Sequence, residues 1–343
     1  MPAALRPALM IASLTVPLAA AAAGPPKTDL AGDPLPAGAI TRLGTLRFRG
    51  SSSDTAVAFF PDGKTLATAG HQASRWDVAT GRLVRRIPAP NALLYSVAVS
   101  PDGKLLATCG TDPHSRPDPV VRLWDAASGK EVRQLTGHGN LVHAVAFSPD
   151  GRSLASGHDG TVRVWEVATG RESLRLAAKG ENEAVAFSPD GRFLASAGSS
   201  GTARVWEVGT GKSKCEFPGP AGDIRSVAFS PDGEFLAWGG ADHDIRLAQV
   251  ATGKLVRRLT APSRYYSHVA FSPDGKTLAS SNHGDGARLW DVATGRVVRE
   301  LAGPVTGALA FSPDGKTLAG VGGNNSLRLW DVATGRPAPQ PHG

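Results

Sequence analysis

The stretch that decides the fold is VAFSPDGRSLASGHDGTVRVWEVATG, residues 145–170. An apolar run leads into a Ser-Pro-Asp-Gly turn, and a Leu-Ala-Ser run, an alternating Arg-Val-Trp run and a second turn follow. Proline presets φ at the first corner of a turn and glycine accepts positive φ, so Pro149 and Gly151 predict a hairpin. We expect three short antiparallel strands here, with a fourth in segments such as residues 131–135.

The same unit occurs seven times, and this repetition predicts the architecture. Pro-Asp-Gly recurs at intervals of 40 to 48 residues, a period typical of β-propellers. Its prolines are Pro61, Pro101, Pro149, Pro189, Pro231, Pro273 and Pro313. A tryptophan follows each proline, about seventeen residues later except in the second copy with its longer loop, where the interval is 23, and the fifth copy has Ala248 instead. The chain is therefore predicted to be all-β, a seven-bladed β-propeller with four antiparallel strands in each blade.

The two ends of the repeat region predict how the ring closes. After Gly335 the chain reads Arg-Pro-Ala-Pro-Gln-Pro, which cannot form a fourth strand because proline lacks an N–H donor. Residues 41–49, TRLGTLRFR, read as a strand that precedes the first unit. Phe48 matches the spacing of the apolar residue that anchors the fourth strand in the other copies. We predict that this N-terminal strand completes the seventh blade.

These repeats resemble those of the WD-repeat family. Trp-Asp stands at 76–77, 124–125, 290–291 and 330–331, and Trp-Glu at 165–166 and 206–207. At the position in the repeat where the family has its Gly-His pair, this chain has it once, at 137–138, and the resemblance covers residues 40–336. By resemblance, the family's hydrogen-bonded structural tetrad maps in the third blade onto His138, Ser156, Asp159 and Trp165. The resemblance also implies binding to a protein partner.

The N-terminus predicts export. Residues 1–23 combine Arg6, an apolar run from Leu9 and three alanines before Gly24, which is the pattern of a secretory signal peptide. We expect a Pro/Gly-rich linker over 24–39, the propeller over 40–336 and a disordered tail over 337–343. The mature protein is then periplasmic or extracellular, without a membrane span. The alternative is a misassigned start and a cytoplasmic protein.

Composition narrows the function classes. The chain has 37 Lys and Arg against 30 Asp and Glu, a formal charge of +7. Its two cysteines, Cys109 and Cys215, are too few for a disulfide framework or a Cys-rich metal site. Nucleic-acid binding is not expected, because export argues against it and the aromatic residues fall mostly at packing positions. An arginine two residues before the tryptophan position should carry charge around the outer rim: Arg122, Arg163, Arg204, Arg246, Arg288 and Arg328.

Recognition is expected at the end of the ring where the loops vary from blade to blade, because loops on a rigid scaffold commonly carry binding residues. The longest of these loops is residues 111–119, TDPHSRPDP. The candidate partner-binding residues are His71, Asp112, His114, Arg116, Asp118, His158, Asp242, His243, His283 and Asp285. A further oddity is His268, which stands where the other repeats have Ala or Ser and either projects into the central channel or reflects local repacking.

The motifs predict neither a metal nor a catalytic site. The His and Asp residues are spread over different blades without metal-ligand spacing, and no Gly-x-Ser-x-Gly elbow occurs. We therefore expect a non-catalytic, monomeric protein-interaction scaffold without cofactors, whose partner the sequence does not name. The alternative is a small-ligand-binding or lyase- or hydrolase-like propeller with its site at the mouth of the central channel.

Overall fold

A computed structural model describes residues 56–89, 93–111, 120–158, 160–219, 222–242, 244–260, 266–282, 286–303, 305, 307–322 and 326–338. All of these residues belong to one compact unit that spans Leu46–Pro341. Every regular element among them is a β-strand. The predicted signal peptide, linker and N-terminal strand lie outside the described residues.

Each blade contains strands that we call a, b, c and d in chain order. The a strands are β1 (Ala56–Phe59), β5 (Leu93–Val99), β9 (Ala144–Phe147), β13 (Asn182–Phe187), β17 (Ile224–Phe229), β21 (Tyr266–Phe271) and β25 (Leu309–Phe311). The b strands are β2 (Thr65–Ala69), β6 (Leu105–Thr111), β10 (Ser153–His158), β14 (Phe193–Gly198), β18 (Phe235–Gly240), β22 (Thr277–Asn282) and β26 (Thr317–Gly322). The c strands are β3 (Ala73–Asp77), β7 (Val121–Asp125), β11 (Thr161–Glu166), β15 (Thr202–Glu207), β19 (Asp244–Gln249), β23 (Gly286–Asp291) and β27 (Ser326–Asp331). The d strands are β4 (Leu83–Ile87), β8 (Glu131–Leu135), β12 (Glu172–Ala177), β16 (Ser213–Pro218), β20 (Lys254–Thr260) and β24 (Val297–Leu301).

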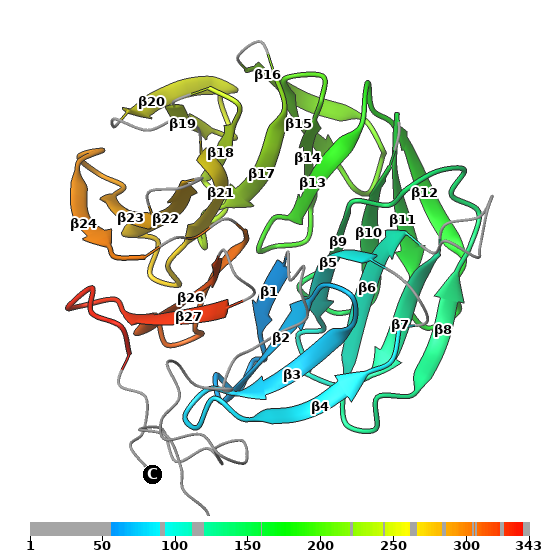
Figure 1. Cartoon of the computed structure of the whole chain (residues 1–343). Helices are drawn as coiled ribbons and strands as arrows, with labels where there is room; N and C mark the ends of the chain where they lie inside the picture. Colours follow the sequence, from blue (N-terminus) through cyan, green and yellow to red (C-terminus); the bar gives the residue numbers. More distant parts are fainter. Residues whose placement is uncertain are drawn as a thin grey trace, which may run out of the picture. The chain divides into compact units, whose positions relative to one another are not determined.

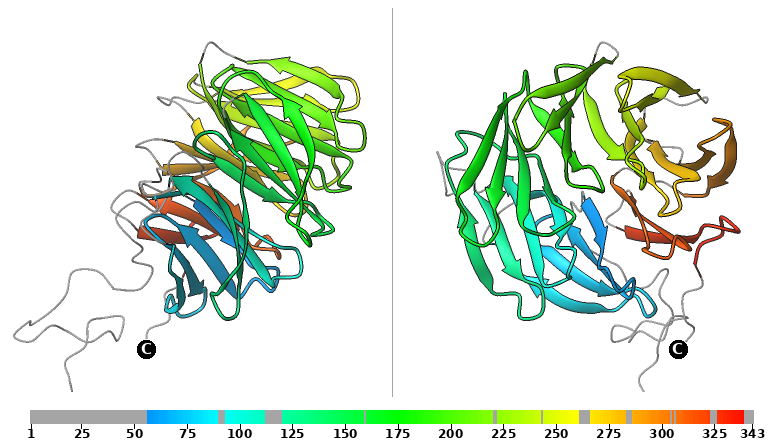
Figure 2. Two further views of the ribbon diagram at one scale, coloured as in Figure 1. Left: turned by 90° about the vertical axis from the view of Figure 1, so that its right-hand side faces the viewer. Right: turned by 180° about the vertical axis from the view of Figure 1, so that it is seen from behind.

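The seven sheets stand around a central axis, with the a strands innermost (Figure 1). Neighbouring strands within every sheet are antiparallel and consecutive in the chain. Blades one to six have four strands, and three strands of blade seven lie in the described part of the chain. Figure 2 shows the same ring from the side and from behind. The predicted fold class is confirmed.

The a–b turns hold adjacent blades in register. The glycine of each Pro-Asp-Gly turn has φ between 64 and 74°, which favours glycine. A methyl group added at these glycines would lie 3.4 to 3.6 Å from the proline Cδ of the preceding blade. The set includes Gly63 of blade one against Pro313 of blade seven, so the chain of contacts is circular. The repeated motif therefore shapes the hairpin and also packs one blade on the next.

Side-chain packing also joins the last blade to the first. Val57, Leu66 and Trp76 of blade one form one buried cluster with residues of blade seven that include Leu327 and Leu329. Corresponding clusters fill the other interfaces between blades. A single four-stranded sheet cannot bury both of its faces, so each blade depends on its two neighbours for burial.

The outer edge of blade seven differs in part from the sequence-based expectation. Pro337 pairs with Trp330, and the Ala338 N–H donates to the Leu329 carbonyl at 2.8 Å. These two residues of the predicted tail therefore lie along β27, where the d strand begins in the other blades. They can do so because Pro337 needs no N–H in this pairing and Ala338 supplies one. The role of residues 41–49 as the closing strand stays a prediction.

Five blades share one buried hydrogen bond between tryptophan and a hydroxyl group. The tryptophan Nε1–H donates to a Ser or Thr on strand b at 2.8 to 3.0 Å. The pairs are Trp76–Thr68, Trp124–Thr108, Trp165–Ser156, Trp206–Ser196 and Trp290–Ser280. In blade five the large and the small residue are exchanged between the two strands. Trp238 stands at the hydroxyl position of strand b, and Ala248 stands at the tryptophan position of strand c. Trp238 is 1% exposed, so the tryptophan missing from the fifth repeat is replaced from the adjacent strand.

The exchange in blade five predicts a pattern in stability. Trp238→Ala should lower the free energy of unfolding by about 3–5 kcal/mol because it leaves a large cavity. Ala248→Trp should cost about 1–3 kcal/mol through overpacking. The double variant Trp238→Ser, Ala248→Trp restores the arrangement of the other blades and should be more stable than Trp238→Ala. Urea unfolding followed by tryptophan fluorescence measures each value. A double variant no more stable than Trp238→Ala would contradict the exchange.

Candidate functional site

The antiparallel order of each sheet gives the ring two different ends. The a–b and c–d turns share one end, here called the turn end, and the d–a and b–c connections share the other, the loop end. Three candidate partner-binding residues are described: His71 is exposed, Asp242 is half-buried and His158 is buried. The others lie outside the described residues, so their role stays a prediction: Asp112, His114, Arg116, Asp118, His243, His283 and Asp285.

In blade three, three members of the tetrad that the resemblance implies are joined by hydrogen bonds. His138 Nε2 lies 2.7 Å from Ser156 Oγ, and Trp165 Nε1 donates to the same oxygen at 2.8 Å. His158 packs 5.2 Å from His138, measured between ring centroids. Burial is the main cause that lowers the pKa of His138 to about 3, and the nearby charge of Arg163 adds to it. The ring is therefore neutral at pH 7 and fits a structural role. Asp159 lies outside the described residues.

The structure corrects the expectation that the arginines two residues before the tryptophan position carry charge around the outer rim. Those of blades three, four and five are less than 9% exposed. Arg163 donates to Glu172 at 2.8 Å and Arg204 to Glu216 at 3.1 Å. Arg246 binds both carboxylate oxygens of Asp242. Strands c and d stand side by side, so a cation on one strand meets a carboxylate on the next or in the loop, and the charge is neutralised inside the blade.

Residues at the start of the inner strands form a cluster that the sequence analysis missed. Tyr95, Glu183 and Arg225 each occupy a β-bulge at the beginning of β5, β13 and β17, and His143 directly precedes β9. The Tyr95 and His143 rings stack across two blades with centroids 5.4 Å apart. We call these four residues and His268 of β21 the channel-mouth cluster, because they lie in or just before the innermost strands of five successive blades (Figure 1), on the side of the d–a connections.

The charges in this cluster influence one another. The pKa of Glu183 is raised, mainly by burial and then by the negative charge of Asp223, while Arg225 and His143 oppose the rise. The pKa of His268 is lowered to about 4, mainly by burial and then by Arg225. His268 pairs with Ser281 in the β21–β22 ladder. The influence of Arg225 places His268 near blade five, and both interpretations, projection into the central channel and local repacking, stay predictions.

One sequence signal would have located most of this cluster. Tyr95, His143, Glu183 and Arg225 all stand six residues before the proline of Pro-Asp-Gly. The repeats are uniform around this turn, yet this column contains a phenol, an imidazole, a carboxylate and a guanidinium in consecutive blades. Such a set offers a flat aromatic surface and both signs of charge, which suits recognition of a peptide.

Comparison with known families identifies the fold family. Residues 114–338, about two thirds of the chain, match the family described as IFT122 first beta-propeller. Residues 81–125 match the WD domain, G-beta repeat. The chain belongs to the WD-repeat β-propellers. Propellers of this family generally act as scaffolds for protein–protein interaction. No curated protein matches the chain.

Two further observations concern the described residues alone. No helix among them has the length and hydropathy that a membrane span needs. No group of three or more His, Cys, Asp or Glu in the same residues is arranged to hold a metal ion.

The lowered pKa of His138 predicts how stability depends on pH. An unfolded histidine takes up a proton near pH 6.5 and the folded ring does so near pH 3, so the unfolded state binds more protons between these values. His138 should therefore contribute a loss of about 2 kcal/mol in unfolding free energy from pH 7 to pH 5. Urea unfolding at both pH values measures it, and His138→Gln should show a correspondingly smaller loss. An equal pH dependence in the two proteins would contradict the assignment.

Proposed function

We propose that the protein is an exported, non-catalytic and monomeric scaffold that binds a segment of a protein partner at the loop end. In this proposal the channel-mouth cluster forms the centre of the binding surface. The variable loops, with residues 111–119 foremost, form its edge. The candidate residues in the loops would supply side contacts, and His138, Ser156 and Trp165 would keep blade three rigid beneath them.

The observation that carries the proposal is the contrast between the two ends of the ring. At the turn end, every blade uses the same Pro-Asp-Gly turn and the same contact with the preceding blade. At the loop end, the column that holds Tyr95 and Glu183 differs in every consecutive blade. Variation concentrated at one end of a rigid frame is typical of a recognition surface.

The alternative, a small-ligand or enzymatic site, depends on one residue. A carboxyl group with a raised pKa is a candidate acid or base, and the pKa of Glu183 is raised. The nearby Arg225 guanidinium and His143 imidazole would then orient a polar ligand. The scaffold remains the better supported function, because the stacked Tyr95 and His143 rings offer contact area beyond that of a small polar site.

Affinity capture from the native host tests the proposal. The bait is the full chain, and the cytosol, cell envelope and culture medium are searched separately. Deletion of residues 111–119, and separately the double variant Tyr95→Ala, Glu183→Arg, should each reduce recovery of the captured partner at least tenfold. Arg171→Ala is the matched control, because Arg171 is highly exposed at the turn end.

The outcomes are distinct. Loss of the partner in both loop-end variants, with normal recovery by Arg171→Ala, supports the loop end as the binding surface. Unchanged recovery in both loop-end variants would overturn it. Recovery from the envelope or medium supports the predicted export, and recovery from the cytosol alone would contradict it.

A further inference from the structure

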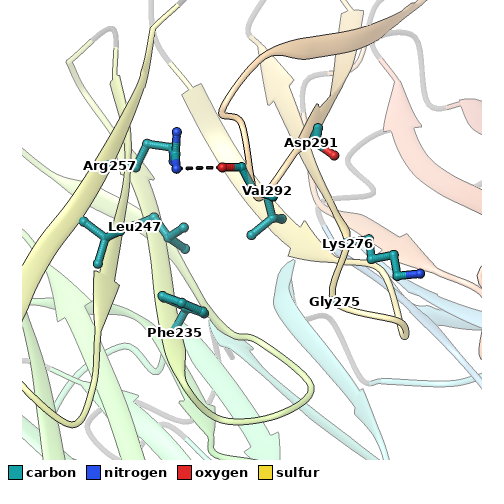
Figure 3. A pocket seen from close by; sticks show the side chains of 9 residues that line it. Phe235, Leu247, Arg257, Gly275, Lys276, Asp291 and Val292 are labelled. Carbon is teal, nitrogen blue, oxygen red and sulfur yellow. Dashed lines mark hydrogen bonds between the residues drawn. The ribbon is translucent and has the colours of Figure 1, made fainter.

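A groove of about 560 Å³ opens between blades five and six, near the turn end. Phe235 and Leu247 come from blade five and Val292 from blade six, and Figure 3 shows their side chains on facing walls. Val256 of β20 and Lys276 also line it. The volume lies within the range of sites that hold small ligands or single large side chains.

Blade four shows why this groove is open. Phe193 of β14 and Phe235 of β18 occupy the same position, the first residue of strand b. The Phe193 ring is covered by two cations: Lys214 Nζ lies 5.0 Å and Arg192 Cζ 5.5 Å from its centroid. In blade five the corresponding residues are Val256 and Glu234. No cation lies over Phe235 in the described part of the chain, so its ring remains available to a ligand.

The polar groups on the groove wall are already fixed by internal bonds. Arg257 donates through Nη2 to the Ala293 carbonyl at 2.7 Å and through Nη1 to the Thr294 carbonyl at 2.8 Å, and Figure 3 shows the guanidinium turned toward this turn. Asp291 Oδ1 accepts the backbone N–H and the hydroxyl of Thr294 at 2.7 and 2.6 Å. These bonds hold both walls in place before any ligand arrives, which reduces the entropy cost of binding.

Besides Arg257 and Asp291, the charged residue that lines the groove is Lys276. Its side chain is exposed at the rim and forms no ion pair with any described residue. Beside it, Val256 of the outer strand β20 lines the groove with a side chain that is 49% exposed. The Lys276 charge also helps to lower the pKa of Asp274, after the hydrogen bonds to that carboxylate from Ser272 and the Lys276 backbone N–H. An apolar surface beside an exposed ammonium group complements a ligand that is apolar with a nearby negative charge.

We infer that this groove, which we call the blade 5/6 groove, binds a peptide segment of a partner protein. A bulky apolar side chain of the segment enters between Phe235, Val256 and Val292, and an Asp or Glu within a few residues pairs with Lys276. The site is separate from the channel-mouth cluster, so the inference does not depend on the function proposed for the loop end.

Selection from a library of random twelve-residue peptides displayed on phage tests the inference, with the immobilised full chain as target. Val256→Lys is the blocking variant, because it copies Lys214 of blade four and so uses an arrangement that this fold already contains. Val298→Lys is its matched control, since Val298 is equally exposed on the next outer strand but does not line the groove. Thermal unfolding of each variant confirms that it is folded.

The selected peptides should contain Leu, Phe, Met or Trp with Asp or Glu within three positions. Their affinity should fall at least tenfold in Val256→Lys and remain within twofold in Val298→Lys. Lys276→Glu should favour peptides in which the acidic residue is replaced by Lys. Tyr95→Ala, Glu183→Arg should leave the affinity unchanged, which separates failure at the groove from failure at the loop end.

Three results would overturn the inference. One is that the selected peptides bind Val256→Lys as tightly as the original chain. Another is that they bind without any preference for an acidic residue. The third is that no peptide is enriched on the original chain over a Val256→Lys counter-target.

Discussion

Closure of the ring is the constraint on which the rest of the structure depends. A four-stranded antiparallel sheet with two apolar faces is unstable alone, so every blade needs a neighbour on each side. The series of contacts between blades has no free end, because Gly63 meets Pro313 and the apolar cluster of Val57, Leu66 and Trp76 continues into blade seven. An open ring would expose two such faces. Pro337 and Ala338 pair at one end of the outer edge of the last blade, and we expect the predicted N-terminal strand, through Phe48, to pair along the remainder of that edge.

Uniformity and variation in the repeats have different physical roles. The Pro-Asp-Gly turns, the tryptophan–hydroxyl bonds and the buried arginine–carboxylate pairs recur because each blade must present the same surfaces to its neighbours. Departures from the pattern are therefore informative. In blade three the addition of His138 gives a buried imidazole network. In blades four and five strand b begins with phenylalanine; Lys214 covers the ring in blade four, whereas Val256 stands at that position in blade five and lines the groove with Phe235. The exchange of Trp238 with Ala248 keeps the core of blade five filled.

The sequence predicts the fold closely because its signals are local and repeated seven times. Pro149 and Gly151 define a hairpin within four residues, and the strands follow from the register around it. The candidate sites are harder to predict from the sequence, because each combines residues from different blades. The stacking of Tyr95 on His143 and the uncovered ring of Phe235 follow from inter-blade geometry and from comparing equivalent positions. The paired state of Arg204 depends on the register between strands c and d, which places Glu216 opposite it.

The most direct test of closure joins the two ends of the ring chemically. Phe48→Cys and Leu327→Cys are introduced together with Cys215→Ser, and the protein is oxidised mildly. In the register of the other blades, the position of Phe48 faces Leu327, at a Cα separation that a disulfide can span. We predict a near-complete disulfide between positions 48 and 327, identified by mass spectrometry, and none when Thr41→Cys replaces Phe48→Cys. Absence of the 48–327 disulfide, or an equal yield from position 41, would contradict closure by the N-terminal strand.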